Sequence, residues 1–398
     1  MIKRTLEKIL RQELQSTPKS ILLLGPRQTG KSTLLKMLGT SLYIDFSDEA
    51  TFQNHLKDPS LLRAVIAPLA DGASIVIDEV QRLPAVLNTV QSIIDRPIDK
   101  SKRHRFLLTG SSARKLRRGN ANLLPGRVFL HSMFPLTYWE LNPQSPESSV
   151  GWNLEIALTK GTLPEVYRHD YGAELLSNYI NTYLKEEIQA EALTRNLSSY
   201  ARFLDLAAEN SGHVINYSSM ASDSEIPKET IRRFYDVLCD TLLAHRITGY
   251  KDIKNKRKAT QKDMFIFFDL GVRNAVLRQH RNTFSATELG KLFEQWFITQ
   301  VIAFNSYHKK EWLLHFYRDD SKNEVDLIID TSRAIVAIEI KYSTSFKADF
   351  IKGLNAFAEV CRKPIRQILV YRGSDHQQRD KTDVVPYQQF LEKTIFEL

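Results

Sequence analysis

The stretch Ile21-Leu-Leu-Leu-Gly-Pro-Arg-Gln-Thr-Gly-Lys-Ser-Thr33 decides the fold of the first part of this chain. Its four apolar residues predict a buried parallel strand, and the GPRQTGKS after them fits G-x-x-x-x-G-K-[ST], with a helix from Lys31. In such a loop the backbone N–H groups point toward the phosphate oxygens, next to the N-terminus of a helix. We expect Lys31 to reach the β- and γ-phosphates of ATP and the Ser32 hydroxyl to bind Mg²⁺. The residues expected to hold the nucleotide are Gly25, Pro26, Arg27, Gln28, Thr29, Gly30, Lys31, Ser32 and Thr33. A Gly-rich turn that binds nothing is the alternative.

A second apolar strand, predicted over Ser74 to Ile77, ends in the two carboxylates Asp78 and Glu79. Carboxylates at the end of a buried strand are costly unless a cation or a polar partner offsets their charge, and a Mg²⁺–nucleotide complex is such a partner. We assign Asp78 to the metal ion, directly or through water, and Glu79 to activation of the attacking water. An ordinary exposed Asp-Glu pair is the alternative. With the upstream loop, the pattern predicts ATP binding and hydrolysis.

Length and composition are those of a soluble globular protein with two to three domains. The chain has 398 residues, of which 42% are hydrophobic and 25% charged. Cys239 and Cys361 are far apart and lack metal-ligand spacing, which argues against a disulfide framework or a zinc site. No apolar run reaches the length of a membrane span, and the N-terminus has the pattern of an amphipathic helix, so we expect a cytoplasmic protein without membrane contact.

Positive charge is concentrated in two stretches of a chain whose net charge is +9. Arg96 to Arg127 contains 10 Lys and Arg residues against one acid, and His245 to Lys262 contains 7 against one. Such stretches favour a polyanionic partner, because binding releases the counterions of the polyanion. We therefore expect a DNA partner, although a solvated basic surface would give the same pattern.

The first domain is predicted over residues 1–165. Strands and helices alternate there, which is typical of a parallel sheet covered on both faces, and a weakly patterned loop (Asn142 to Ser149) lies near its end. The predicted strands are Ile21–Leu24, Leu42–Asp45, Ser74–Ile77, Phe106–Thr109 and Val128–Met133, and a helix is predicted over Pro84–Ile94.

Residues 166–262 are predicted to form a helical lid that includes a winged helix-turn-helix. The pattern from Tyr171 to Tyr250 is all helical, and Ile215 to Ile231 indicates a helix, a tight turn and a second helix over Lys228 to Leu243. A β wing is predicted within Tyr250 to Lys262. The recognition helix would present Lys228, Thr230, Arg232 and Arg233. Many such modules contact only proteins, so nucleic-acid binding and protein binding both stay open.

Residues 263–398 are predicted to form an α/β domain with a metal-binding face. Strands are expected over Phe265–Asp269, Glu324–Ile329, Ala334–Lys341 and Gln367–Tyr371, and helices over Leu289–Ala303 and Phe350–Val360. Strand periodicity places Glu339 and Lys341 on one face, and a hairpin can bring Asp326 beside them. Asp326 and Glu339 would hold Mg²⁺ or Mn²⁺, Lys341 would help to deprotonate the attacking water, and Glu294 would complete the set. A plain Glu339–Lys341 ion pair is the alternative.

The chain as a whole resembles a known family. The motifs that carry the resemblance occur in this order: GPRQTGKST (Gly25 to Thr33), IVIDEVQRLP (Ile75 to Pro84), FLLTGSS (Phe106 to Ser112), LPGRV (Leu124 to Val128), FPLTYWEL (Phe134 to Leu141), GTLPE (Gly161 to Glu165), FFDLGVRNA (Phe267 to Ala275), EVDLII (Glu324 to Ile329) and IEIK (Ile338 to Lys341). Over nearly all 398 residues it resembles the prokaryotic AAA+-type P-loop ATPases with a C-terminal restriction-endonuclease-like domain of the PD-(D/E)XK superfamily.

The resemblance implies an α/β protein with three parts: an AAA+/RecA-like ATPase core, a helical lid and a nuclease-like domain. It implies a sensor role toward the γ-phosphate for Ser111 or Ser112, where many AAA+ proteins have Asn. It also implies that Arg127 is an arginine finger acting in a homo-oligomer such as a ring. The alternative is a structural arginine that packs on the lid or an arginine that binds phosphate. Many relatives keep only the nuclease fold, so a DNA nuclease and an ATP-driven switch that cuts nothing both remain open.

Overall fold

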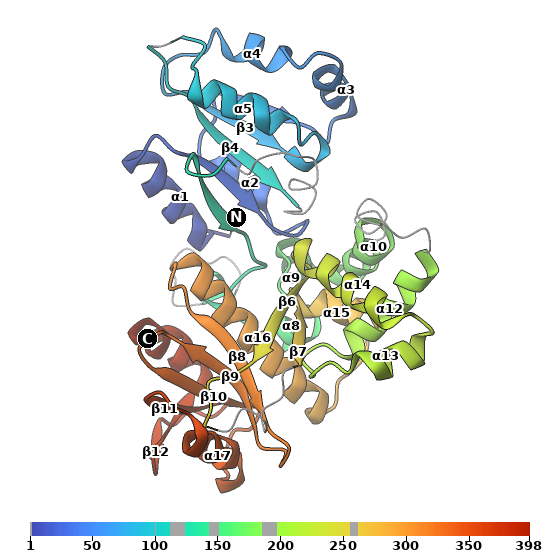
Figure 1. The fold of residues 1–398 in the computed structure, drawn as a ribbon, viewed down its shortest axis with the longest axis vertical. Coiled ribbons are helices and arrows are strands. Elements are labelled where there is room, and N and C mark those ends of the chain that lie inside the picture. The colour runs from blue at the N-terminus through green and yellow to red at the C-terminus, as the bar shows by residue number, and fades with distance from the viewer. Residues whose placement is uncertain (1, 100, 112–123, 143–150, 185–196, 255–261) are drawn as a thin grey trace. The chain divides into compact units, whose positions relative to one another are not determined.

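The computed structural model describes residues 2–99, 101–111, 124–142, 151–184, 197–254 and 262–398, which group into two compact units (Figure 1). One unit runs to Leu136 and includes Val237–Leu243; the other contains the remaining described residues. Several predictions involve residues outside the described ranges. They concern Ser112 and parts of the Asn142–Ser149 loop, of the wing and of both basic stretches.

The first unit alternates helices with parallel strands. Its elements are α1 (Thr5–Ser16), β1 (Ser20–Leu24), α2 (Lys31–Met37), β2 (Leu42–Asp45), α3 (Glu49–Lys57), α4 (Leu61–Ile66), β3 (Ser74–Asp78), the 3-10 turn η1 (Val80–Arg82), α5 (Val86–Asp95), β4 (Arg105–Gly110) and β5 (Val128–Ser132). The predicted strands, the helix from Lys31 and the amphipathic N-terminal helix are confirmed.

In the described part of this unit, the strands form one parallel sheet in the order β2-β3-β4-β1-β5. Alternate strand residues such as Leu22, Ile75 and Leu108 face a fully buried core that α4 and α5 cover with Leu62 and Val90. Strand β4 separates β1 from β3. The loop after β1 and the acids at the end of β3 therefore lie at one sheet edge, on either side of the end of β4.

The second unit begins with short helices and continues into a large mixed sheet. Its helices are α7 (Tyr138–Leu141), α8 (Leu154–Thr159), α9 (Pro164–Arg168), α10 (Gly172–Asn178), η2 (Tyr179–Leu184), α12 (Leu197–Glu209), α13 (Tyr217–Ser224), α14 (Lys228–Asp240, whose last four residues belong to the first unit), α15 (Leu270–Val276), α16 (Ala286–Tyr307), η3 (Ala348–Ile351), α17 (Lys352–Val360), α18 (Tyr387–Gln389), η4 (Phe390–Thr394) and α19 (Ile395–Glu397). Its strands are β6 (Ala244–Gly249), β7 (Asp263–Phe267), β8 (Leu313–Arg318), β9 (Glu324–Asp330), β10 (Ile335–Lys341), β11 (Ile365–Tyr371), β12 (Gln377–Arg379) and β13 (Thr382–Pro386).

These strands are ordered β12-β13-β11-β10-β9-β8-β6-β7 within the described residues. β9 and β10 form the predicted antiparallel hairpin, with Ile338 opposite Leu327 and Ala337 opposite Ile328. Helix α17 packs Leu354 on one face of this sheet. β6 pairs in parallel with β8 and antiparallel with β7. One sheet therefore contains both the hairpin β9–β10, which has the predicted metal-binding residues, and the strands β6 and β7, which flank the predicted wing.

The prediction that Tyr171 to Tyr250 is all helical is wrong, because Ala244–Gly249 is strand β6. Helix α14 ends at Asp240, before the predicted Leu243. Leu242 has a φ of 61°, in the left-handed region, where an α-helix of L-residues cannot continue. The backbone groups of the residues that follow pair with β7 and β8.

The strand predicted over Phe265 to Asp269 is shifted, because β7 spans Asp263–Phe267. Asp269 is instead the N-cap of α15 and accepts a hydrogen bond from the backbone N of Val272. None of the helices in the described ranges is long and apolar enough to cross a membrane.

Candidate functional sites

The loop after β1 has the backbone shape that phosphate binding needs. A Cβ on Gly25 would lie 2.5 Å from the carbonyl O of Met133, so only glycine fits there without displacing backbone. Gln28 and Gly30 have φ values of 62° and 94°, which turn the chain into α2. The Lys31 ammonium donates to the carbonyls of Gly25 (2.8 Å) and Pro26 (2.9 Å) and so lies within the loop.

Arg4, which the sequence did not single out, fastens this loop from the start of α1. Its guanidinium donates to the carbonyl O of Thr29 (2.6 Å) and to that of Phe134 (2.7 Å). The Thr29 hydroxyl in turn donates to the Pro26 carbonyl at 2.9 Å. Arg4 is buried. Only the fold brings it, 25 residues away in sequence, to the loop.

Asp78 lies at the end of β3, and hydroxyl groups fix both of its carboxylate oxygens. Tyr43 of β2 donates to one oxygen and Thr109 of β4 to the other. Burial and the hydrogen bond to Asp78 raise the pKa of Tyr43, whereas a hydrogen bond with Ser32 acts in the opposite direction. Ser32, Tyr43 and Asp78 therefore form one cluster of oxygen atoms, the donor type that Mg²⁺ prefers. The sequence did not indicate Tyr43 or Thr109, because both come from other strands.

Glu79, the expected base, has a φ of 57°, a left-handed conformation uncommon for a residue with a side chain. Its backbone N donates to the Thr109 hydroxyl at 3.0 Å. Its carboxylate accepts a hydrogen bond from the Gln81 side-chain amide, which also donates to the Ser111 hydroxyl at 2.9 Å. The predicted sensor, Ser111, is thus connected to the predicted base through Gln81. Gln81 lies within the quoted motif Ile75 to Pro84, but no role was predicted for it. The sensor role itself stays a prediction.

Arg127 lies just before β5, at the sheet edge opposite the phosphate loop. In the register of β1 and β5, Ser20 pairs with Val128 and Leu24 with Ser132. Five residues of strand separate Arg127 from the loop edge, or roughly 16 Å at about 3.3 Å per residue. The half-exposed guanidinium forms two hydrogen bonds with Asp95, of 2.6 and 2.9 Å. Arg127 therefore cannot serve the nucleotide of its own loop, and a role toward a neighbouring subunit stays a prediction.

In the second unit the predicted metal-binding residues come together. The Lys341 ammonium lies 2.5 Å from Glu339 Oε1 and 3.6 Å from Asp326 Oδ2. Asp326 also accepts a hydrogen bond of 2.7 Å from the backbone N of Ile340. The predicted proximity of the three side chains on the hairpin is confirmed. Their catalytic role stays a prediction. The structure also contains the Glu339–Lys341 ion pair, which is the structural alternative to a metal-binding site.

The electrostatics of this cluster are those of crowded, buried carboxyl groups. Burial, together with the Asp326 carboxylate, raises the pKa of Glu339 to about 8 and that of Glu294 on α16 to about 9. Burial lowers the pKa of Lys341, but Asp326 and Glu339 outweigh it, so the net shift is upward. Glu294 thus lies within electrostatic reach of the hairpin residues, as predicted.

Glu339 Oε2 is buried and has no hydrogen-bond partner. An orphaned carboxylate oxygen beside a second carboxylate fits a divalent cation, which takes oxygen ligands and offsets the burial of charge. Across the described ranges, no group of three or more His, Cys, Asp and Glu residues is arranged to hold a metal ion. A metal ion here would therefore rest on Asp326 and Glu339.

A pocket of about 220 Å³ opens beside this cluster, and we call it the carboxylate pocket. The carboxylates of Glu294, Glu324 and Asp326 line it together with the cationic side chains of Lys291 and Arg318, and Arg318 Nε lies 3.0 Å from Glu324 Oε1. The segment Gly212–Val214 also lines this pocket. The cations of this pocket attract anions, and its carboxylates have the oxygen ligands that divalent cations prefer.

The helix, tight turn and second helix predicted from Ile215 to Ile231 are observed as α13, a turn at Glu225 and α14. Lys228, Arg232 and Arg233 are exposed on α14, and Thr230 is half-buried. The described residues contain the two strands, β6 and β7, that flank the predicted wing. DNA recognition by this module stays a prediction.

Comparison with known proteins identifies the first unit. Residues 17–142 match the family model described as an AAA domain. Residues 152–283 and 289–390 match two models described as domains of unknown function, DUF8612 and DUF4143. The N-terminal part is therefore an AAA-type P-loop ATPase domain, and these matches assign no activity to the rest.

The chain is similar to an uncharacterized protein of Mycobacterium tuberculosis, with 26% identity over 352 residues, or 84% of this chain and 73% of that protein. An uncharacterized protein of Mycobacterium bovis gives the same values. Among solved structures, it is similar to a Walker-type ATPase of Pyrococcus abyssi, with 15% identity, a TM-score of 0.45, and coverage of 69% of this chain and 96% of that one.

Proposed function

We propose that this chain, whose residues 17–142 form an AAA-type domain, hydrolyses ATP and uses the cycle to control a Mg²⁺-dependent DNA nuclease in its C-terminal part. The observation that carries the nuclease proposal is the buried, partnerless Oε2 of Glu339 beside Asp326 and Lys341. We propose residues 1–165, 166–262 and 263–398 as the ATPase core, the lid with a winged helix-turn-helix, and the nuclease domain.

In the ATPase site, Lys31 would neutralise the β- and γ-phosphates, and Ser32 and Asp78 would hold Mg²⁺. The metal ion would offset the charge that develops on the phosphate oxygens. Glu79 would accept a proton from the water that attacks the γ-phosphorus, with ADP as leaving group. The fixed orientation of the Asp78 carboxylate supports this assignment, since Tyr43 and Thr109 hold both of its oxygens.

In the nuclease site, Asp326 and Glu339 would hold Mg²⁺ or Mn²⁺, which would supply a Lewis acid at the scissile phosphate. Lys341 would orient the attacking water or help to deprotonate it, and Glu294 would support the site from α16. The lining cation Lys291 supports binding of a phosphodiester in the carboxylate pocket, and Arg318, whose ion pair with Glu324 is exposed, would add a second positive charge.

We also propose a cytoplasmic homo-oligomer, such as a ring, in which Arg127 reaches the nucleotide of a neighbouring subunit. The position of Arg127 at the sheet edge opposite its own phosphate loop supports a role between subunits. DNA is the proposed partner because of the basic stretches and the module formed by α13, α14, β6 and β7.

The test is cleavage of plasmid DNA with Mg²⁺ or Mn²⁺ and ATP by wild type, Lys341→Ala and the matched control Lys347→Ala, in which an exposed lysine is changed. We expect wild type and Lys347→Ala to nick or linearise the plasmid and Lys341→Ala to lose this activity. Lys31→Ala should alter the ATP dependence of cutting. Uncut plasmid with every protein, while ATP is hydrolysed, would reject the nuclease.

That outcome would favour the second candidate, an ATP-driven switch whose C-terminal fold serves assembly or partner binding. The specific observation in its favour is the Glu339–Lys341 ion pair at 2.5 Å, which gives both residues a structural role without any metal ion.

A further inference from the structure

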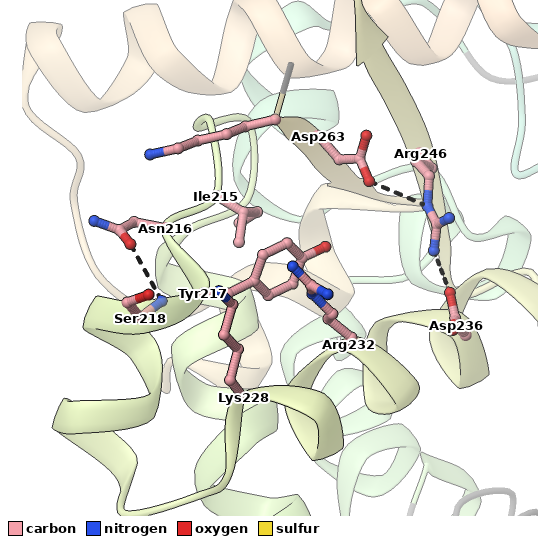
Figure 2. Close-up of a pocket in the computed structure, with 10 residues that line it drawn as sticks. Ile215, Asn216, Tyr217, Ser218, Lys228, Arg232, Asp236, Arg246 and Asp263 are labelled. Atoms are coloured by element: carbon pink, nitrogen blue, oxygen red, sulfur yellow. Dashed lines mark hydrogen bonds and ion pairs between the residues drawn. The ribbon is translucent and has the colours of Figure 1, made fainter. Parts of the chain in front are cut away.

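A second pocket of the C-terminal unit, which we call the basic pocket, has a volume of about 470 Å³ (Figure 2). It lies among the starts of α13 and α14 and strands β6 and β7. The charged residues of its lining, counted over the described residues, are four cations and two carboxylates: Lys228, Arg232, Arg246, Lys262, Asp236 and Asp263. Four positive and two negative charges leave a net charge of +2, which attracts anions.

The two carboxylates are engaged by one cation. Arg246 donates a hydrogen bond to Asp236, and its Nε lies 3.9 Å from Asp263 Oδ2. Figure 2 shows this group at one end of the pocket, whereas Lys228 and Arg232 reach from α14 toward the Tyr217 ring. The positive charge is therefore concentrated away from the carboxylates, around Tyr217.

The chemistry around Tyr217 suits a phosphate with a flat, stackable group beside it. The Arg232 guanidinium lies 5.1 Å from the centroid of the Tyr217 ring. Arginine binds phosphate through two parallel hydrogen bonds, and aromatic rings and guanidinium planes stack with bases. The ion pair of Arg232 with Glu229 is exposed, with side chains 48% and 77% accessible, and such pairs contribute no more than about 1 kcal/mol. It would not prevent Arg232 from binding a phosphate.

The basic pocket adjoins the carboxylate pocket along one continuous segment. Gly212–Val214 line the carboxylate pocket, and Ile215–Ser218 line the basic pocket. Backbone hydrogen bonds to β7 fix this segment: Gly212 N donates to Phe265 O (2.8 Å) and Ile215 N to Asp263 O (2.9 Å). Three residues from Val214 to Tyr217 span at most about 10 Å. One nucleic-acid strand advances by a similar distance in about three nucleotides.

We propose that the basic pocket holds a backbone phosphate of the nucleic-acid strand whose scissile phosphodiester lies in the carboxylate pocket, a few nucleotides away along Gly212–Ser218. The proposal rests on the nuclease function proposed above and adds the place where the substrate strand is anchored. It distinguishes a pocket anchor, which includes Lys262 immediately before β7, from contacts made only by the outer face of α14.

The experiment measures binding without cutting, so that it is independent of nuclease activity. Full-length protein carrying Glu339→Gln binds a short fluorescent single-stranded DNA in metal-free buffer, followed by fluorescence anisotropy over a series of salt concentrations. The pocket variants are Lys228→Gln and Lys262→Gln, and the matched control is Arg202→Gln, an exposed position on α12 of the same unit. Circular dichroism and melting temperature check that each variant is folded.

We expect each pocket variant to weaken binding about tenfold and to lower the salt slope by about 0.7, the contribution of one phosphate contact on a single strand. Arg202→Gln should stay within about twofold of the parent. If Lys262→Gln binds the DNA as tightly as the control Arg202→Gln, the proposal is wrong. It is also wrong if an acidic phosphopeptide displaces the labelled DNA as effectively as unlabelled single-stranded DNA does. Plasmid cleavage by the wild type separately reports the failure or success of the nuclease itself.

Discussion

The side-chain amide of Gln81 donates hydrogen bonds to both the Glu79 carboxylate and the Ser111 hydroxyl. The opposite amide orientation would place the amide oxygen against the carboxylate, so the two contacts fix the orientation. In this arrangement the amide Oε1 of Gln81 is buried without a partner. Gln81 therefore connects the residue expected to activate water at the end of β3 with the residue expected to sense the nucleotide after β4.

Gln81→Ala tests whether this contact positions the base. We expect kcat for ATP hydrolysis to fall about tenfold to a hundredfold, a part of the roughly 10²–10⁴-fold that a positioned general base supplies, while KM changes less than about twofold. Gln81→Glu should lower kcat at least as much, because a second carboxylate would repel Glu79. Steady-state kinetics of each variant supply both constants. A rise in KM at constant kcat would instead assign Gln81 to nucleotide binding.

The ATPase roles are separated by changing Lys31 and Glu79 in turn. Lys31→Ala should weaken ATP binding and abolish hydrolysis, because it removes the charge next to the β- and γ-phosphates. Glu79→Gln should retain binding and slow hydrolysis by about a hundredfold or more, since an amide cannot accept the proton of water. Calorimetry gives binding and phosphate release gives turnover. Full turnover by Glu79→Gln would reject its assignment as the base.

The Arg127–Asp95 contact provides two matched variants, one at each residue, that test the proposed role of Arg127 between subunits. Arg127→Ala should lower ATP hydrolysis by roughly 10³-fold if the guanidinium reaches a neighbouring nucleotide. Asp95→Asn, which breaks the same exposed ion pair, should leave hydrolysis nearly unchanged. Mixing Arg127→Ala with Glu79→Gln protein should restore part of the activity. Equal losses in both single variants, without rescue on mixing, would leave Arg127 a structural residue.

The carboxyl groups of the nuclease-like face predict how stability depends on pH. With pKa values raised from 4.5 to about 8 and about 9, Glu339 and Glu294 bind more protons in the folded than in the unfolded protein across that range. Their stabilising contribution is therefore full below about pH 4.5 and is lost as the pH rises through 8 to 9. The melting temperature of metal-free wild type should fall over this range, and that of Glu339→Gln should fall less.

Glu359→Gln, an exposed change on α17, serves as the control and should follow the wild type. Mn²⁺ at alkaline pH should raise the melting temperature of wild type but not of Glu339→Gln, because a ligand that binds only the folded state stabilises it. If Mn²⁺ shifts neither protein and Glu339→Gln lowers the melting temperature at every pH, the face is a degenerate nuclease fold.

Local sequence patterns predicted much of the fold. The apolar run before Gly25 and the helix from Lys31 are local features, and the strands of the first sheet appear where β-branched and apolar runs predict them. The meeting of Asp326 with Glu339 and Lys341 was predictable as well, because a short antiparallel hairpin with a period of two leaves few registers.

The sequence failed where tertiary pairing decides the structure. Ala244–Gly249 has no clear alternation that would mark it as a strand, and it becomes β6 because β7 and β8 pair with its backbone. The side chains that orient the candidate sites were missed for the same reason. Tyr43, Thr109 and Arg4 belong to other elements and meet Asp78 or the phosphate loop only in the folded sheet.

The sequence by itself determined which residues have the chemistry for phosphate and metal binding, because that chemistry depends on residue type and on short spacings along one element. The tertiary structure decided which hydroxyl groups and amides hold those residues in place, and on which edge of the sheet Arg127 lies. It also set the basic pocket next to the carboxylate pocket along Gly212–Ser218. These relationships depend on strand order and register, which arise from hydrogen bonds and packing between segments far apart in the chain.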